Sequence, residues 1–240
     1  MKRNIFIAAV VAIAGMALAH WYFGDRGRFT TEPEYRGLAR TVSGNDLISE
    51  HDPAATLRFD PAYRYIGGQK FILYGNADTE QHFFVETTAD DKLESVYWVQ
   101  YEAYLPNKPY TYNYDDSPLQ VTLGDYVFQT DTDVFPFDPN RKRRRGTDGA
   151  MARQFLASKG YSYPSEVVYA RLVYLTDASR DKELMIIFMG DLAPLGLTAA
   201  ELQEEGANAA RWPEIEKAHL ERIENTLEVL PTGTDGSSQP

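Results

Sequence analysis

The chain has 240 residues, no cysteine and a formal net charge of −11 at pH 7. The absence of cysteine excludes disulfides, thiol catalysis, cysteine-ligated zinc and a lipid-modified cysteine anchor. Such an acidic chain is also a poor generic binder of nucleic acid, because contacts with phosphates require a basic surface.

The stretch that begins at Ile5 and ends at Phe23 is uncharged and follows a short basic tail. As a helix, which rises ~1.5 Å per residue, it would span about 28 Å, close to the ~30 Å apolar core of a bilayer. We therefore expect residues 1–23 to form a transmembrane signal anchor, with the following domain on the extracytoplasmic side of the membrane. The alternative is a signal peptide cleaved after Ala19, which would release a secreted or periplasmic protein.

Residues 24–65 contain many glycines and prolines and little periodicity, which predicts a linker and an irregular lead-in. A globular domain is expected over residues 66–230, where β-rich runs alternate with turn sequences. Strands are predicted at residues 70–74, 82–87, 94–105, 119–123, 126–130, 166–175 and 183–189. Short loops between consecutive strands favour antiparallel pairing, and the last run is apolar on both faces, which predicts cover on both sides of the sheet.

Helices are predicted between and after these strands. Residues 148–159 have an apolar face and end before Gly160, and Thr198 with Glu201 forms the capping-box pattern of a short helix. Pro213 opens a longer helix, whose apolar stripe includes His219 and Leu227. The fold class is therefore α+β, a single domain with one antiparallel sheet of about six strands packed by C-terminal helices. Residues 231–240 are expected to be a disordered tail.

The predicted strand at residues 94–105 has one face that mixes aromatic and polar side chains. With a period of two, this face carries Trp98, Gln100, Glu102 and Tyr104. Aromatic rings supply apolar area and a few polar groups fix a ligand's orientation, so the row is a candidate wall of a ligand-binding site. A face that is solvated, or that the lead-in covers, is the alternative.

Arg171 lies among apolar residues of its predicted strand and needs an acceptor, because an unpaired buried charge is very costly. Glu102 is one candidate acceptor. Their pair would either be purely structural or would hold a polar ligand, so Arg171 joins the candidate ligand-binding residues.

Tyr110, Tyr112 and Tyr114 alternate along the chain after the same strand. An exposed row of tyrosines is a candidate contact for a protein partner, because each side chain combines a stiff ring with a polar tip. The alternative is an edge strand that buries one face of the row.

The basic run that begins at Arg141 and ends at Arg145 has an open role. It could contact anionic lipid headgroups, or it could form a solvated loop that pairs with the acidic C-terminal helix.

Catalytic, metal and nucleotide motifs are not recognisable in this sequence. There is no G-x-S-x-G nucleophile elbow and no Walker or Rossmann glycine pattern. The aspartates around Asp131 and Asp133 fail the spacing of a calcium-binding EF-hand loop. His219 is most simply a core histidine. We therefore expect no catalytic residue, no cofactor and no metal.

The leading functional hypothesis is a non-enzymatic domain, membrane-tethered through the segment from Ile5 to Phe23 or exported, that binds a protein partner or a small apolar ligand. The alternative is a hydrolase-like enzyme that uses a carboxylate such as Glu102 in an aromatic cleft. Two carboxylates, or a carboxylate and His82, that converge in one deep cleft would favour the enzyme.

Overall fold

The computed structural model describes residues 32–138, 140 and 146–232. The expected anchor between Ile5 and Phe23, the basic run from Arg141 to Arg145 and residues 233–240 of the expected tail lie outside the described residues. Among the helices that the structure describes, none has the length and apolar character needed to cross a bilayer.

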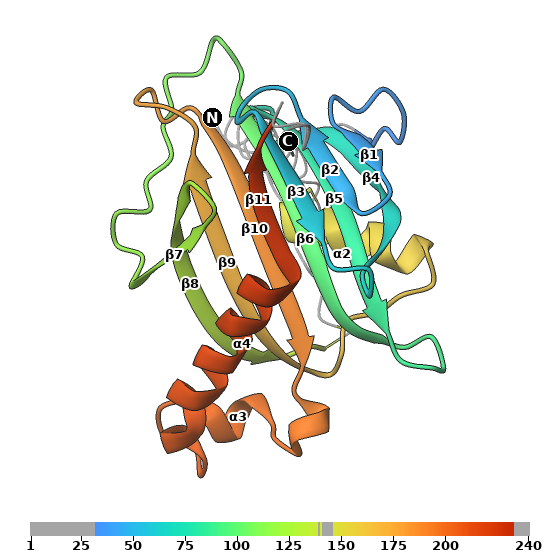
Figure 1. Ribbon diagram of the computed structural model, residues 1–240, viewed down its shortest axis with the longest axis vertical. Helices are drawn as coiled ribbons and strands as arrows, with labels where there is room; N and C mark the ends of the chain where they lie inside the picture. Colours follow the sequence, from blue (N-terminus) through green and yellow to red (C-terminus); the bar gives the residue numbers. More distant parts are fainter. Residues whose placement is uncertain (1–31, 139, 141–145, 233–240) are drawn as a thin grey trace, which may run out of the picture.

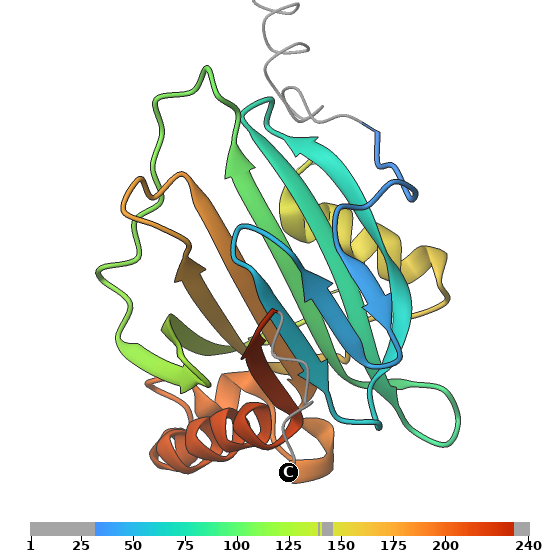
Figure 2. The same ribbon diagram turned by 45° about the horizontal axis from the view of Figure 1, so that its top comes forward.

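Within the described residues, two antiparallel sheets stack face to face (Figures 1 and 2). The large sheet has seven strands in the order β4-β5-β6-β10-β9-β8-β7. These strands are β4 (Arg64–Leu73), β5 (Ala77–Thr87), β6 (Leu93–Tyr104), β7 (Leu119–Leu123), β8 (Tyr126–Pro136), β9 (Glu166–Leu175) and β10 (Lys182–Asp191). The small sheet has the order β1-β2-β3-β11 and consists of β1 (Thr41–Ser43), β2 (Asp46–Ser49), β3 (Ala55–Phe59) and β11 (Leu227–Pro231).

The α-helices that the structure describes are α2 (Asp148–Ser158), α3 (Ala199–Leu202) and α4 (Trp212–Thr226), and two short 3-10 turns, η1 (Ala193–Leu195) and η2 (Ala209–Arg211), flank α3. Helix α2 covers the face of the large sheet opposite the small sheet, and the C-terminal helices pack at one end of the strands (Figures 1 and 2). The predicted capping box at Thr198 is confirmed, since its hydroxyl accepts from the Glu201 amide and the Glu201 carboxylate accepts from the Thr198 amide.

The predicted α+β class is confirmed, but the molecule contains more sheet than expected. The predicted strands correspond to β4–β10, while part of the expected irregular lead-in, residues 41–59, forms β1–β3. These strands have only 3, 4 and 5 residues, too few for a clear alternating pattern. Leu227 was expected on the helical stripe of α4; it instead begins β11, because it pairs with Phe59 of β3.

Each face of the large sheet has its own apolar core. Toward the small sheet, the rings of Phe59 and Phe84 stack with centroids 3.9 Å apart. Toward α2, the rings of Phe83 and Phe155 stack at 4.7 Å. Strand β10 contributes buried apolar side chains to both cores, so the predicted cover on both sides is confirmed.

His219 of α4 is a core histidine, as predicted. Its side chain is buried, and its ring stacks on Phe188 of β10 with centroids 4.7 Å apart. Burial lowers the pKa of His219 to about 4, so the ring is neutral at physiological pH.

Candidate functional site

A cavity of about 400 Å³ opens on the α2 face of the large sheet. Its volume falls in the range of small-molecule sites, roughly 300–1,000 Å³. Strands β6, β8, β9 and β10 and the segments beside α2 supply an aromatic and apolar lining, which is Trp98, Phe135, Phe137, Tyr163, Tyr169, Met185, Ile187 and Met189. Charged groups also line it, which are Asp133, Asp138, Asp148 and Arg171. We call this space the α2-face cavity.

Trp98 is one of the predicted site residues that line this cavity. It lies on β6 between Phe83 of β5 and Ile187 of β10, so its ring is fixed by neighbours on both sides. The side chain is only 4% exposed, and its indole N–H has no hydrogen-bond partner within the described residues. A buried donor without a partner costs about 1–3 kcal/mol, so this N–H would gain from an acceptor that reaches it.

Arg171 also lines the cavity, but the predicted pairing with Glu102 is wrong. Its guanidinium donates to Asp131 Oδ2, at 2.7 Å from Nη2 and 3.2 Å from Nε. Asp131 lies directly opposite on β8, whereas Glu102 lies on β6, and β10 separates β6 from β9. Because neighbouring strands are ~4.8 Å apart, the adjacent carboxylate takes the arginine.

Glu102 instead lies beside a second carboxyl group, that of Glu183, which is far from it in the sequence. Glu102 of β6 and Glu183 of β10 are direct cross-strand partners on the α2 face. Burial raises the pKa of Glu102 to about 7. Burial, and then the charge of Glu102, raises the pKa of Glu183 to about 8. We call these two residues the carboxyl pair; neither belongs to the lining of the α2-face cavity.

A row of side-chain amides leads across three strands to the carboxyl pair. Gln69 donates to Gln81, Gln81 donates to Gln100, and each of these hydrogen bonds is 2.7 Å long. Gln100 then donates to Glu102 Oε2, also at 2.7 Å. The predicted neighbours Gln100 and Glu102 therefore form one buried polar network next to the cavity, with fixed orientations.

The predicted tyrosine row does not form one exposed surface. Residues 105–118 contain neither helix nor strand, and Tyr110 is 49% exposed while Tyr112 is buried. The Tyr112 ring stacks on Tyr104 with centroids 4.4 Å apart, and its hydroxyl donates to Glu102 Oε1 at 2.8 Å. Tyr114 packs against the core under α2. Tyr104 and Tyr112 thus belong to the surroundings of the carboxyl pair, which leaves Tyr110 as the exposed member.

On the opposite face of the sheet, His82 is held between Tyr65 and Glu80. The ring Nδ1 lies 3.0 Å from the Tyr65 hydroxyl, and Nε2 lies 2.8 Å from Glu80 Oε1. Burial raises the pKa of Tyr65 to about 12, with a smaller contribution from Glu80, so the phenol is not activated as a nucleophile. Glu80 also accepts from the backbone amides of Ala39 and Arg40, at 2.7 and 3.0 Å. Glu80 of β5, held by His82, therefore binds the backbone of the lead-in.

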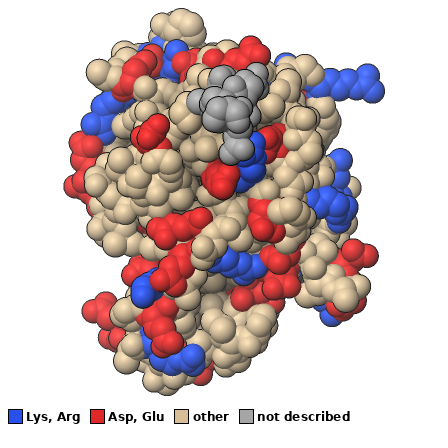
Figure 3. All heavy atoms as spheres, in the orientation of Figure 1, with Lys and Arg blue, Asp and Glu red and all other residues tan. Residues whose placement is uncertain are grey.

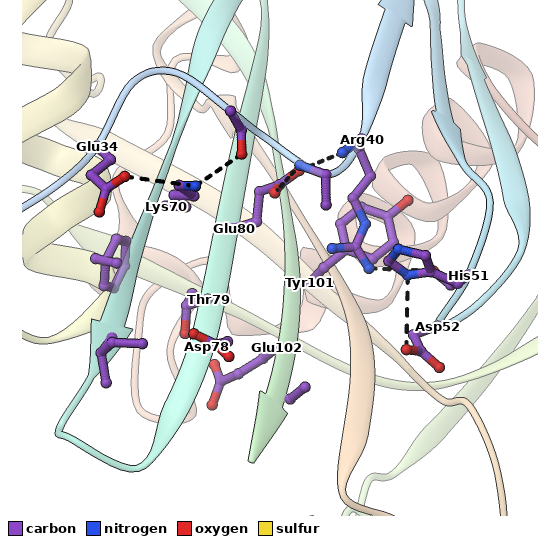
Figure 4. A pocket seen from close by; sticks show the side chains of 15 residues that line it. Glu34, Arg40, His51, Asp52, Lys70, Asp78, Thr79, Glu80, Tyr101 and Glu102 are labelled. Atoms are coloured by element: carbon purple, nitrogen blue, oxygen red, sulfur yellow. Dashed lines mark hydrogen bonds and ion pairs between the residues drawn. The ribbon is translucent and has the colours of Figure 1, made fainter. Parts of the chain in front are cut away.

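Another pocket, of about 430 Å³, lies where the lead-in crosses β4, β5 and β6 (Figure 4). The Arg40 guanidinium lies 4.0 Å from the centroid of the Tyr101 ring, and Lys70 bonds the carbonyl of Gly37 at 2.9 Å. Lys70 also lies 3.6 Å from Glu34. Arg40, Lys70 and Glu80 thus hold the lead-in in place, and Glu102 of the carboxyl pair also lines this pocket.

Comparison of the chain with protein-family models, with curated proteins and with solved structures gives no match. Of the residues that the structure describes, no three His, Asp or Glu side chains gather in a way that could hold a metal ion. On the face shown in Figure 3, basic side chains are scattered among acidic ones rather than joined into a continuous basic area. The functional argument therefore depends on the geometry of the α2-face cavity and the carboxyl pair.

Proposed function

We propose that this chain is a non-enzymatic binding domain that holds a small, largely apolar ligand in the α2-face cavity. The observation that carries the proposal is the aromatic lining of this cavity, which includes Trp98, a residue whose indole N–H is buried and has no partner within the described residues. Burial of apolar ligand surface supplies roughly 25 cal/mol per Å², and one hydrogen bond to the indole would fix the ligand's orientation. A ligand with an apolar body and one acceptor atom meets both requirements.

The proposal is tested by calorimetric titration with 2-naphthol and with naphthalene, which differ by one hydroxyl group. We expect 2-naphthol to bind more tightly to the native protein, because its oxygen accepts from Trp98. Trp98→Phe should abolish this preference and keep the binding of naphthalene. Ile187→Phe, which fills the cavity, should weaken both probes at least tenfold.

Val127→Ala is the matched control, because Val127 is 47% exposed and is absent from the cavity lining. This variant should bind both probes as the native protein does. Equal binding by the native protein and Ile187→Phe would place the probes outside the cavity and would overturn the proposal.

We also propose that the domain is membrane-tethered on the extracytoplasmic side or exported. The support is the uncharged stretch from Ile5 to Phe23 after a basic tail. Mass determination of the mature N-terminus together with membrane fractionation tests this proposal. An intact N-terminus in the membrane pellet means an anchor, and a chain that starts at His20 in the soluble fraction means cleavage after Ala19. An intact chain in the soluble fraction would contradict both.

The second candidate is a hydrolase-like enzyme, which the carboxyl pair favours. Carboxyl groups whose pKa values are raised toward neutrality can act as general acids. It ranks second because Glu183 is only 2% exposed and lines neither of the two cavities, although Glu102 lines the pocket of Figure 4. Hydrolysis of chromogenic esters or glycosides that is lost in Glu102→Gln would reverse this ranking.

A further inference from the structure

Residues 105–118 connect β6 to β7 without helix or strand, and we call them the strap. Figure 2 shows the strap running along the end of the large sheet, past the turn between β9 and β10. The strap's backbone is bound to that turn, because the amide of Tyr112 donates to the carbonyl of Arg180 at 2.7 Å. The Arg180 side chain in turn donates to the carbonyl of Tyr112 and to Asp115, at 2.9 Å in each case.

Two tyrosines of the strap lie against the carboxyl pair. The hydroxyl of Tyr112 donates to Glu102 at 2.8 Å, and the hydroxyl of Tyr114 interacts with the carboxyl of Glu183. Glu183 Oε2 is buried and has no hydrogen-bond partner within the described residues. The closed strap therefore lies over a buried carboxyl group, that of Glu183, which has an unsatisfied oxygen, and over its half-buried partner Glu102, which also lines the pocket of Figure 4.

The other charged and titratable groups around the pair do not neutralise it. Asp148 of α2 and Tyr104 of β6 add negative or neutral groups. Arg171 of β9 acts on Glu183 in the favourable sense, but its guanidinium is bound to Asp131. Two ionised carboxylates would thus repel each other, because the guanidinium that attracts Glu183 is already bound to Asp131.

We propose that the strap is a pH-controlled gate, which closes over the carboxyl pair when the pair carries protons and lifts when both groups are ionised. In the closed state the two carboxyl groups bind protons more tightly than usual. In an open, hydrated state they regain their ordinary affinity for protons. By linkage, rising pH must favour the open state. The hydrogen bond from Tyr112 to ionised Glu102 opposes this effect but does not cancel it, since burial still leaves the pKa of Glu102 at about 7. The strap therefore opens as pH rises through about 7 to 8.

The strap also holds part of the cavity wall. The Arg171 guanidinium lies 5.3 Å from the centroid of the Tyr114 ring, and Ser117 donates to Asp131 Oδ2 at 3.1 Å. Lifting the strap removes both contacts and frees the Arg171 side of the α2-face cavity. This step, which makes ligand exchange pH-dependent, rests on the proposed function, whereas the motion of the strap does not.

The test uses a nitroxide spin label on the strap of the full chain. Because the protein has no cysteine, Asp116→Cys, at an exposed position, gives a single labelling site. Electron paramagnetic resonance spectra from pH 5 to pH 9 then report the mobility of the strap without any ligand. We expect an immobile label at pH 5 and a mobile fraction that rises several-fold between about pH 7 and pH 8.

In the background Glu102→Gln with Glu183→Gln the label should stay immobile at every pH, because glutamine resembles the protonated carboxyl group. Tyr112→Phe, which removes one strap contact, should shift the midpoint to lower pH. Glu86→Gln is the control, since Glu86 of β5 bonds Ser95 and Arg222 rather than the strap, and it should leave the transition unchanged. A label whose mobility does not change with pH in the native chain, or that changes equally in the double glutamine variant, would overturn the gate.

Discussion

Glu183 owes its neighbours to the order of the strands in the large sheet. It precedes an apolar run on β10 and is the last of four consecutive charged residues, after Arg180, Asp181 and Lys182. Its importance appears only with the sheet order, which inserts β10 between β6 and β9 and sets Glu183 opposite Glu102. The same long-range insertion explains why Arg171 pairs with Asp131 on β8. Residue types predicted a polar patch among aromatics, but only register decides which charges meet.

The carboxyl pair makes the stability of the fold depend on pH. The unfolded chain releases the Glu183 proton near 4.5, while burial raises the pKa of this group in the folded state to about 8. A raised folded-state pKa gives stability that is complete below the unfolded value and is lost as pH rises through the folded value. Unfolding free energy should therefore fall between about pH 4.5 and pH 8, by on the order of 2 kcal/mol before strap opening limits the loss.

Urea unfolding at several pH values checks this prediction. The unfolding free energy of Glu183→Gln should fall less than that of the native protein between about pH 4.5 and pH 8. At pH 8 this variant should be more stable than the native protein. Glu228→Gln, on the exposed side of β11, should follow the native curve. If native stability instead increased from pH 5 to pH 8, the carboxyl pair would be ionised in the closed state and the gate would lose its basis.

At the scale of elements, local signals predicted β4–β10, because long β-rich runs and turn sequences mark their bounds. The capping box predicted α3 equally well, since hydrogen bonds between residues three apart need no distant partner. β1–β3 were missed because segments of 3 to 5 residues between turn formers carry too little pattern. β11 was missed for a different reason: the helical stripe of α4 continues to Leu227, and only pairing with β3, far away in sequence, turns that residue into a strand.

The candidate site was predictable to the same extent. Alternation along β6 placed Trp98, Gln100 and Glu102 on one face, and the structure brings all three to the α2 side. The strap could not be predicted, because its tyrosines resemble an edge strand and its contacts with Glu102 and Arg180 join distant segments. An alternating pattern of tyrosines does not distinguish a β-strand from an irregular segment that forms no hydrogen-bonded pair with a neighbouring strand.

At the scale of the whole molecule, the two sheets meet where the β7–β8 turn touches the C-terminal strand. Gly124 in this turn has a φ of +58°, and a Cβ atom added there would lie 2.1 Å from the carbonyl oxygen of Val229 on β11. The last strand of the small sheet is therefore in contact with the edge hairpin of the large sheet. This contact closes the sandwich on the face of the large sheet opposite α2.

Gly124→Ala tests that closure, and Gly44→Ala is its matched control. Gly44 has nearly the same φ, +59°, but nothing within 4 Å of the position of an added Cβ. Both substitutions carry the cost of a left-handed alanine, about 1 kcal/mol, but only Gly124→Ala also forces β11 away from the hairpin. In urea unfolding we expect Gly124→Ala to lose roughly 1–3 kcal/mol more than Gly44→Ala, the scale of strain or overpacking in a packed contact. Equal losses in the two variants would mean that the turn and β11 are apart in solution, so that the small sheet is held to the large sheet by their shared apolar core alone.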